Sequence, residues 1–340
     1  MPSALVTHSE THPVRIERFR RRLGHPVETL ELPPGGLESN AEVDRRLAEA
    51  LADHDALFLR PGRVTRELLD ATDLDVVAVH GSGYDHVDVE AATEAGVVVT
   101  HNPEGPGPAV VEHTLGFAVA LLREFAARDD AVGRGDWSAA RHEVTELGRT
   151  TVGVVGQGTI GFEVARRMRE FGAEVLACDP YVTGERTSNI YPRVSRQQVE
   201  DEGVELVARD DLFERADLVT VHTPLTDDTR GLVGAAELDA LGAGYLVNTS
   251  RGPVVDEDAL YAAVTDGQLR GAALDVMREE PPAPDNPLLG LDDVLITPHV
   301  AGVSEGYLER AADLAAEKVG AVFAGERPER MVNPEVWGGD

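Results

Sequence analysis

A strand-forming run leads directly into three closely spaced glycines between Thr151 and Gly161, where the sequence reads TVGVVGQGTIG. The glycines follow the spacing G-x-G-x-x-G, and an amphipathic helical pattern continues after them. In a dinucleotide-binding fold the first glycine permits a tight turn, the second lets the phosphates approach the backbone, and the third allows the helix to pack closely on the strand. The phosphates then bind the amides at the helix N-terminus. We therefore expect a dinucleotide to bind at Gly156, Gly158, Thr159, Ile160 and Gly161.

A carboxylate at the end of the next expected strand indicates which dinucleotide is bound. That strand, EVLACD, ends at Asp179, which lies 18 residues beyond Gly161. An acidic side chain there accepts hydrogen bonds from both ribose hydroxyls of NAD and repels the 2′-phosphate of NADP, so the sequence favours NAD. A structural glycine turn followed by an unrelated aspartate is the alternative interpretation. Three arginines that follow could also fold back and neutralise the carboxylate: Arg186, Arg193 and Arg196.

Short apolar runs alternate with helical patterns along most of the chain, which is typical of parallel sheets built from βαβ units. Five strand candidates precede Asn102 and seven more follow Thr150. We predict an α/β fold with two doubly wound parallel-sheet domains, a flavodoxin-like substrate domain and a Rossmann NAD-binding domain. The strand candidates are ALVTH, PVETLEL, ALFLR, VVAVH and GVVVT, then TVGVV, EVLACD, ELVA, LVTVH, YLVNT, GAALDV and VLITP.

The substrate domain is predicted to be discontinuous in sequence. A Pro/Gly-rich stretch from Asn102 to Pro108 interrupts the alternation and precedes a helix from Val110 to about Ala127. The last helical pattern runs from Glu305 to about Phe323, and it is expected to return to the first domain, which lacks a covering helix. The predicted domains are therefore residues 1–106 with 303–340, and residues 107–302, joined by two crossings as in a hinge.

A large excess of acidic residues limits the partners of this chain. Its 61 acidic and 31 basic residues give a formal charge of −30, and Lys318 is the only lysine. Such a surface repels nucleic acid and anionic membranes, so neither is expected as a partner. Because the acidic residues are spread over the whole length, we interpret them as a solvated shell suited to concentrated salt, where repulsion is screened over about 3 Å at 1 M. An ordinary acidic cytosolic protein is the alternative.

The sequence gives no signal for export or membrane insertion. No apolar run approaches the roughly 20 residues that span a bilayer. The N-terminus has no basic region leading into an apolar one. Cys178 is the single cysteine, so an internal disulfide is excluded, which fits a reducing compartment. We therefore predict a cytoplasmic protein.

Polar side chains follow four of the strands expected in the second domain. Ligands of doubly wound sheets bind beyond the carboxyl ends of the strands, so these side chains are expected on the same rim as the phosphate-binding loop. Oxidation of an alcohol needs a base for the hydroxyl proton, and histidine, with an ordinary pKa of about 6.5, suits this role near neutral pH. A carboxylate can fix the histidine ring, and an arginine can bind a substrate carboxylate through two parallel hydrogen bonds. The residues are Thr223 and Pro224, Thr249 and Arg251, Asp275 with Glu279 and Glu280, and His299; the two threonines and Pro224 are expected on the cofactor side.

Together these residues describe a site for a 2-hydroxy acid, with no metal expected. Each of the three central residues also has an ordinary interpretation. His299 could be a structural histidine, Arg251 a surface residue after a turn, and Glu280 the cap of a proline-rich loop. Their convergence on one rim downstream of a dinucleotide fingerprint favours the functional interpretation.

At these residues the sequence closely resembles the D-isomer-specific 2-hydroxyacid dehydrogenases, a family that includes phosphoglycerate, glycerate, D-lactate and hydroxyisocaproate dehydrogenases. The resemblance covers nearly the whole chain, through motifs such as HGSGYDHVDVEAATEAGVVVTHNPEG, GVVGQGTIG, VHTPLTDDTRGLV, LVNTSRGPVVDEDAL, GAALDVMREEPP and VLITPHVAG. It implies an enzyme that transfers hydride reversibly between NAD(H) and a 2-hydroxy or 2-keto acid. It also implies a homodimer formed through the NAD-binding domain, with the helix from Val110 in the contact.

The resemblance assigns roles residue by residue. Arg251 matches the catalytic arginine, which we expect to bind the substrate carboxylate and carbonyl; Glu280 and His299 match the glutamate and the acid–base histidine. Asp275 matches the residue that contacts the nicotinamide amide. A backbone loop that binds the substrate carboxylate from the other domain matches Gly81, Ser82 and Gly83.

The substrate itself is left open by the sequence. A phosphate-bearing substrate would need extra arginines, for which Arg60 and Arg63 are candidates. The sequence departs from the family pattern in two places. A longer link from Thr187 could alter the adenine side of the cofactor site, and the hinge HNPEGPGPAVVEH could alter the cofactor contacts there. The competing function is a dinucleotide-sensing binding protein of the same fold.

Overall fold

The computed structural model describes residues 1–33, 41–102, 107–138, 143–186 and 194–338. The chain divides into two compact units. The first unit is Met1–Pro106 with Val303–Asp340, and the second unit is Gly107–Gly302. Within the described ranges, no helix is long and apolar enough to cross a membrane.

The first unit is built on a five-stranded sheet whose strands are all parallel and whose order is β2-β1-β3-β4-β5. This is the flavodoxin-like order, so the topology predicted for this part of the chain is confirmed. The central strand β3 and its neighbour β4 are completely buried, which explains their uninterrupted apolar sequences. The strands are β1 (Ala4–His8), β2 (Val27–Glu31), β3 (Ala56–Leu59), β4 (Val76–Val79) and β5 (Val98–Thr100).

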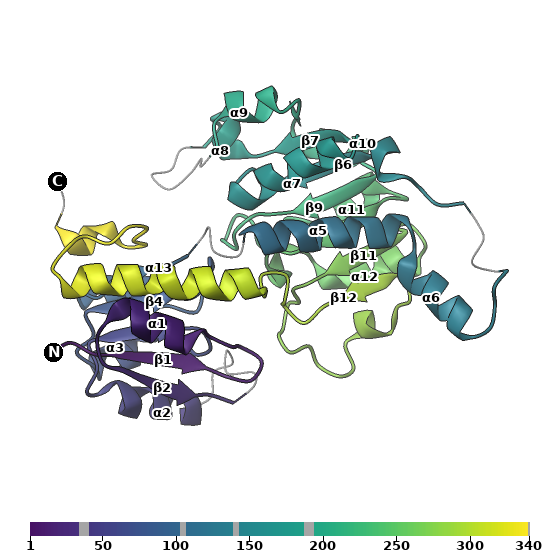
Figure 1. The fold of residues 1–340 in the computed structure, drawn as a ribbon. Helices are drawn as coiled ribbons and strands as arrows, with labels where there is room; N and C mark the ends of the chain where they lie inside the picture. The colour runs from purple at the N-terminus through teal and green to yellow at the C-terminus, as the bar shows by residue number, and fades with distance from the viewer. Residues whose placement is uncertain (34–40, 103–106, 139–142, 187–193, 339–340) are drawn as a thin grey trace. The chain divides into compact units, whose positions relative to one another are not determined.

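The C-terminal helix α13 (Glu305–Phe323) belongs to this first unit. It lies along α1 and covers the sheet, as Figure 1 shows for the yellow and purple helices. Its small residues Ala312, Ala315 and Val319 are fully buried in one cluster with Val6 and Phe58 of the sheet. The predicted helix from Glu305 to Phe323 is therefore confirmed, together with its return to the N-terminal sheet. The other helices of this unit are α1 (Ile16–Leu23), α2 (Ala41–Leu51), α3 (Arg66–Asp70), α4 (Val89–Glu94) and the 3-10 helix η5 (Pro334–Trp337).

The second unit is built on a seven-stranded parallel sheet in the order β12-β11-β10-β9-β6-β7-β8. The order reverses at β6, so the glycine-rich loop after β6 lies at the topological switch point, where ligands of such sheets bind. The predicted Rossmann topology is confirmed in all seven strands. They are β6 (Thr151–Val155), β7 (Glu174–Cys178), β8 (Glu205–Leu206), β9 (Leu218–Val221), β10 (Tyr245–Asn248), β11 (Gly271–Leu274) and β12 (Val294–Ile296).

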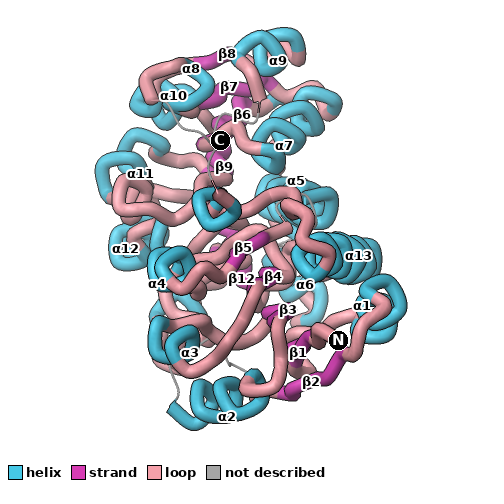
Figure 2. The backbone as a smooth tube through the Cα atoms, turned by 90° about the vertical axis from the view of Figure 1, so that its left-hand side faces the viewer, coloured by secondary structure: helices cyan, strands magenta, loops and turns pink. Residues whose placement is uncertain are grey.

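Helices cover both faces of this second sheet. One core cluster joins Val152 and Val154 of β6 to α5 and α7, and the other joins Val155 to α10, α11 and α12. Figure 2 shows α5 and α7 on one side and α11 and α12 on the other. The helices are α5 (Gly107–Leu122), α6 (Phe125–Gly133), α7 (Thr159–Glu170), α8 (Pro180–Thr183), α9 (Arg196–Asp201), α10 (Arg209–Arg215), α11 (Ala235–Leu241) and α12 (Glu257–Thr265), with 3-10 helices η2 (Leu147–Arg149), η3 (Gly252–Val254) and η4 (Pro287–Gly290).

One predicted helix is wrong in its extent. The helix expected from Val110 to about Ala127 is two helices, because Glu124 adopts a left-handed backbone conformation with φ of 51°. The buried face of α5 stops at Leu122, and Phe125 beyond the break is 54% exposed. No buried contact therefore keeps the chain helical through Glu124, and α6 starts in a new direction.

Two segments that depart from the family pattern fall partly outside the described residues. Residues 103–106 of the hinge and 187–193 of the longer link lie there. The rest of the link forms α9, whose N-terminus is a capping box in which Ser195 and Gln198 bond reciprocally.

Candidate active site

His299 and Glu280 form a direct pair in the second unit. Nδ1 of His299 lies 2.6 Å from Oε2 of Glu280. The His299 side chain is 44% exposed, and the structure gives its other ring nitrogen, Nε2, no protein partner among the described residues. A ring that donates from Nδ1 to a carboxylate has its Nε2 lone pair available when neutral. The pair therefore presents Nε2 outward as a proton acceptor.

Glu280 is ionised at neutral pH. Burial alone would raise the pKa of this carboxyl group. The hydrogen bond with His299 lowers the pKa, as do the amide of Met277 and the charge of Arg251. The net pKa lies below the ordinary 4.5. The Met277 amide donates to Oε1 at 3.0 Å, so both carboxylate oxygens are engaged. Glu279, its neighbour, is exposed. Of the two glutamates singled out in the sequence, only Glu280 faces His299.

Arg251 is carried by the loop that follows β10. Asn248, at the end of that strand, is 1% exposed; its Nδ2 donates to the Arg251 carbonyl at 3.0 Å, and its Oδ1 accepts from the Ser250 amide at 3.0 Å. Next to Arg251, Gly252 lies directly against the following loop, since a Cβ there would be 1.9 Å from the Met277 carbonyl oxygen. Any larger residue would push apart the loops that carry Arg251 and Glu280.

The three predicted catalytic residues thus come from three neighbouring strands. Arg251 follows β10, Glu280 follows β11 and His299 follows β12, and these strands are adjacent in the sheet. The carboxyl ends of parallel strands meet at one edge, which is why residues far apart in sequence gather there.

Asp275 has a structural role that the sequence did not reveal. It is 2% exposed, and its carboxylate accepts from the Thr297 hydroxyl at 2.5 Å and from the amides of Val300 and Ala301, each at 2.8 Å. The loop that carries His299 therefore wraps around this carboxylate. The Asp275 carbonyl also accepts from the His299 amide at 2.8 Å. His299 adopts a left-handed φ of 52°, a conformation that needs such support in a residue other than glycine. The contact with nicotinamide that the resemblance assigns to Asp275 stays a prediction.

The glycine-rich loop has the shape that a dinucleotide requires. Gly156 has a φ of 94°, and a Cβ there would lie 2.7 Å from the His222 carbonyl oxygen. A Cβ on Gly161 would lie 2.0 Å from the Gly156 carbonyl oxygen, so helix and strand meet closely. Gly158, by contrast, faces open space and begins α7 without a side-chain cap. The N-terminus of α7, with Thr159 and Ile160, is therefore free to bind phosphate through its amides.

The two threonines expected on the cofactor side follow β9 and β10, and Thr223 lies against Gly156 of this loop. Thr223 has a buried hydroxyl that lacks a hydrogen-bond partner in the described structure, and Pro224 follows it after β9. Thr249, after β10, shares a hydrogen bond of 3.0 Å with Thr114 of α5. An orphaned hydroxyl beside the glycine loop is a polar group that a bound cofactor could satisfy.

Asp179 lies directly beside the glycine-rich loop. Its Oδ2 accepts from the Gln157 amide at 2.7 Å, and its Oδ1 accepts from the Tyr181 amide at 2.8 Å. The arginines that could have neutralised it pair elsewhere: Arg186 with Asp228, and Arg196 with Glu200 at 2.9 Å. Arg193 lies outside the described residues.

The loop predicted to bind the substrate carboxylate belongs to the first unit and follows β4. Gly81 accepts from the Asn102 amide at 2.8 Å, and the carbonyl of Ser82 accepts from the ring of His101 at 2.8 Å. Gly83 completes the loop. Asn102 and His101 also accept from Lys318 of α13, which fixes the start of the crossing to the C-terminal helix.

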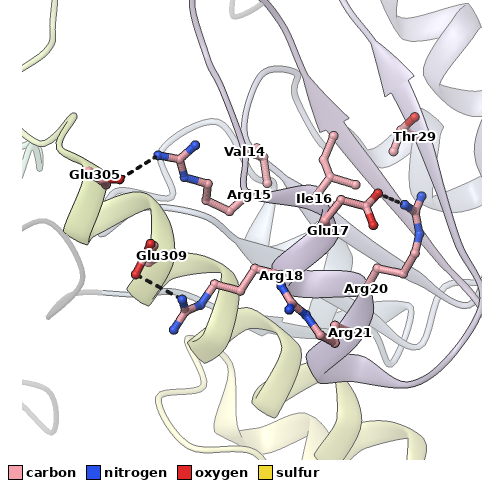
Figure 3. Close-up of a pocket in the computed structure, with 10 residues that line it drawn as sticks. All are labelled: Val14, Arg15, Ile16, Glu17, Arg18, Arg20, Arg21, Thr29, Glu305 and Glu309. Carbon is pink, nitrogen blue, oxygen red and sulfur yellow. Dashed lines mark hydrogen bonds and ion pairs between the residues drawn. The ribbon is translucent and has the colours of Figure 1, made fainter.

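A surface cavity of about 690 Å³ in the first unit does not contribute to this site. It lies where α1 and α13 pack together, and its charged side chains are largely paired with one another (Figure 3). Arg18 reaches Glu309 at 3.1 Å, and Arg15 reaches Glu305 at 3.9 Å. Within the described part of the chain, no group of three or more His, Cys, Asp or Glu side chains could hold a metal ion.

Two parallel sheets, with a glycine-rich loop at the switch point of the second and a histidine–carboxylate pair on its rim, are typical of two-domain dehydrogenases. Residues 115–301 match the family described as D-isomer specific 2-hydroxyacid dehydrogenase, NAD binding domain. The chain belongs to this family of D-isomer specific 2-hydroxyacid dehydrogenases. The family and the fold class predicted from the sequence are therefore confirmed.

Relatives with different names resemble the chain to a similar degree. D-3-phosphoglycerate dehydrogenase of Methanocaldococcus jannaschii is 38% identical over 84% of this chain and 53% of its own length. Glyoxylate reductase of Korarchaeum cryptofilum is 38% identical over 91% of this chain and 95% of its own length. The chain thus spans about half of the first relative and nearly all of the second.

Solved structures show the same two-domain fold. D-lactate dehydrogenase from Aquifex aeolicus, complexed with NAD and lactic acid, is 25% identical with a TM-score of 0.80, over 97% of this chain and 99% of that one. NADPH-dependent glyoxylate/hydroxypyruvate reductase from Sinorhizobium meliloti, in complex with NADP and malonate, is 28% identical with a TM-score of 0.77. The match covers 98% of this chain and 97% of that one.

Proposed function

We propose that the protein is an NAD-dependent D-2-hydroxyacid dehydrogenase that interconverts a 2-hydroxy acid and its 2-keto acid. The observation that carries the proposal is the 2.6 Å pair of His299 and Glu280 on the rim that also holds Arg251 and the glycine-rich loop. The names of the relatives, which act on phosphoglycerate, glyoxylate or lactate, fit a small 2-hydroxy or 2-keto acid as substrate.

The residues of the rim divide the chemistry among them. When bound, the nicotinamide supplies or accepts the hydride. In the oxidative direction Nε2 of His299 takes the hydroxyl proton, and Glu280 stabilises the imidazolium through Nδ1. Arg251 binds the substrate carboxylate and polarises the neighbouring carbonyl oxygen. In the reductive direction His299 returns the proton to the carbonyl oxygen.

A panel of 2-keto acids tests this proposal. Purified protein is incubated in molar salt with NADH and glyoxylate, pyruvate, hydroxypyruvate or phosphohydroxypyruvate, and the loss of NADH absorbance is followed. We expect turnover with at least one of them. Turnover with none would favour the competing function, a dinucleotide-sensing binding protein.

The same panel identifies the substrate class. Arg60, one candidate for a phosphate contact, is largely enclosed in the first unit, with Nη1 at 2.8 Å from Nδ1 of His80 and the guanidinium 5.7 Å from the centre of the Tyr307 ring. Burial lowers the pKa of Arg60 below its ordinary value. Arg63, the other candidate, is partly exposed. A preference for phosphohydroxypyruvate over hydroxypyruvate would assign an arginine of this kind to the substrate phosphate.

We expect NADH to be preferred over NADPH by at least about 10-fold in kcat/KM. The Asp179 carboxylate is held beside the glycine-rich loop by the amide of Gln157, and Arg186 is drawn away from it by Asp228. A 2′-phosphate would therefore meet the negative charge of Asp179, while Arg186 and Arg196 pair with other carboxylates. The two cofactors are compared at saturating keto acid, and equal use of both would contradict the assignment.

Glu280→Gln is expected to move the alkaline limb of keto-acid reduction to lower pH by about one unit. Because the pKa of Glu280 is lowered, its pairing is fully present above about pH 4.5 and is lost only as the pH falls through the lower folded value. At neutral pH the substitution therefore removes a negative charge that stabilises protonated His299. The profile of kcat/KM against pH measures the shift. Glu279→Gln, an exposed neighbour, is the control, and identical profiles for both variants would argue against the pairing.

We further propose that the protein works in concentrated salt. The charge of −30 opposes folding by self-repulsion, which salt screens. We expect the melting temperature to rise by about 5 °C or more between low salt and molar salt. Surface ion pairs such as Arg18 with Asp313 act in the opposite direction, because salt weakens them. A melting temperature that is flat or falling across the salt series would rule the proposal out.

A homodimer formed through the second unit is also proposed. Large apolar side chains are exposed there, including Phe125 at 54%, Trp137 at 67% and Phe171 at 57%. A contact between two copies would bury such side chains, and contiguous apolar surface is typical of contact surfaces. Light scattering in solution gives the mass that tests it.

A further inference from the structure

Glu257, in the first turn of α12, is a buried carboxylate for which the proposed chemistry gives no use. It is only 5% exposed. Its Oε1 accepts from the amide of Arg278, and its Oε2 accepts from Nδ2 of Asn286 at 3.2 Å. A buried carboxylate with two protein donors is costly to remove, since the donors would be left without partners.

We propose that Glu257 is a positioning residue for the acid–base pair: it fixes the loop backbone that carries Glu280, and through Glu280 it orients the ring of His299. The proposal rests on the proposed function, because it assigns a role within the same reaction. Glu257 touches neither His299 nor any group expected to react, so its effect is exerted through the loop.

The contacts form a continuous chain from α12 to the histidine. Glu257 fixes the amide of Arg278, and the preceding amide, Met277, donates to Oε1 of Glu280 at 3.0 Å. Oε2 of Glu280 then lies 2.6 Å from His299. On its other side, the same peptide of Met277 and Arg278 is in close contact with Gly252. The peptide between Met277 and Arg278 is therefore held between α12 and the Arg251 loop. The Glu257 carboxylate, by fixing this peptide, sets the position of the Glu280 carboxylate.

Asn286 makes this contact sensitive to the identity of residue 257. Its Oδ1 accepts from the Leu288 amide at 3.0 Å, where it caps η4. The side-chain amide therefore cannot rotate without losing that cap, and Nδ2 must face Glu257. In Glu257→Gln, an oxygen can still accept from Arg278, but the new NH₂ group then meets the NH₂ group of Asn286. Two donors face each other, and the contact opens.

The reversed pair should restore the contact. In Glu257→Gln combined with Asn286→Asp, the carboxylate at 286 accepts from both Leu288 and the new NH₂ group, while the oxygen of the glutamine accepts from Arg278. Asn286→Asp alone places two carboxylates against each other and should also perturb the loop. The two single variants and the double variant therefore form a cycle with a predicted rescue.

The control is Asp258→Asn. Asp258 follows Glu257 and contacts the same residue, but through the guanidinium of Arg278 at 3.2 Å, with side chains that are 80% and 49% exposed. It undergoes the same chemical change at the adjacent position. Because an exposed ion pair does not fix the Arg278 amide, this variant should behave as the wild type.

The experiment compares pH profiles of keto-acid reduction with NADH for the wild type and these variants. For Glu257→Gln we expect kcat to fall about 10-fold, because small displacements of reacting groups have effects of this order or larger. We also expect the alkaline limb to move to lower pH by about half a unit, because Glu280 supports His299 less well. The double variant should return to within about threefold of wild-type kcat, and the alkaline limb of its pH profile should coincide with that of the wild type.

The outcomes separate this proposal from the proposed function. If the wild type turns over keto acids but Glu257→Gln shows an unshifted limb, or the double variant is not rescued, Glu257 has no positioning role. If the wild type turns over no keto acid, the proposed function fails, and the positioning role with it. If Glu257→Gln does not fold, Asn286→Asp serves as the perturbing variant, and an unshifted limb there overturns the proposal.

Discussion

His299→Ala is expected to lower kcat for keto-acid reduction by on the order of 100-fold or more, which is the usual contribution of a positioned acid–base group. The ring lies 2.6 Å from Glu280 through Nδ1, so its removal takes away the group proposed to exchange the substrate proton. The loop itself should survive, because Asp275 holds it through the amides of Val300 and Ala301 and not through the His299 ring.

Two readouts separate loss of the acid–base group from loss of structure. The dissociation constant for NADH, measured by fluorescence titration, should be unchanged, because the glycine-rich loop is not in the altered segment. The melting temperature should also stay close to that of the wild type. A variant that keeps kcat within about 10-fold of the wild type would show that His299 is not the acid–base group.

Arg251→Lys is expected to reduce kcat/KM for the keto acid by about 100-fold, because lysine keeps the charge but loses the two parallel donors, and a hydrogen bond to a charged group contributes about 1.5–3 kcal/mol. Asn248 and Gly252 hold the backbone on both sides of the residue, so the substitution changes the donor set and not the loop. The loss should appear chiefly in KM for the keto acid, with KM for NADH unchanged.

Arg278→Lys is the matched control for this substitution. Arg278 belongs to the neighbouring loop, its guanidinium pairs with Asp258 at the surface, and its backbone amide contact with Glu257 does not depend on the side chain. Its kcat/KM should lie within about twofold of the wild type. If Arg251→Lys also stays within about twofold of the wild type, Arg251 acts only through its charge and not through paired hydrogen bonds.

The sheets could be predicted because burial leaves a direct trace in the sequence. Strands such as β3 and β4 are buried on both faces, so they are continuous apolar runs bounded by polar loops. The division of the long helix into α5 and α6 leaves no such trace. The break at Glu124 depends on where tertiary contacts stop, at Leu122, and residues beyond it are still compatible with a helix.

The convergence of Arg251, Glu280 and His299 on one edge of the sheet could be predicted because the carboxyl ends of adjacent parallel strands must meet. The supporting residues could not. Gly252 is needed because a Cβ there would be 1.9 Å from the Met277 carbonyl, and that approach between two loops has no local signal. Glu257 looks like any acidic residue in the first turn of a helix, yet it is 5% exposed and binds a distant loop. The sequence predicts Asp275 as a cofactor-binding residue, but its hydrogen bonds to the His299 loop have no signal in the sequence.

The stereochemistry of the product tests the central claim most directly. The best keto acid of the panel is reduced with NADH by the wild type in molar salt, and the hydroxy acid formed is resolved by chiral chromatography. A dehydrogenase of this family with His299 as its acid–base group should yield the D-2-hydroxy acid alone. An L or racemic product, or no product from any keto acid, would contradict the account.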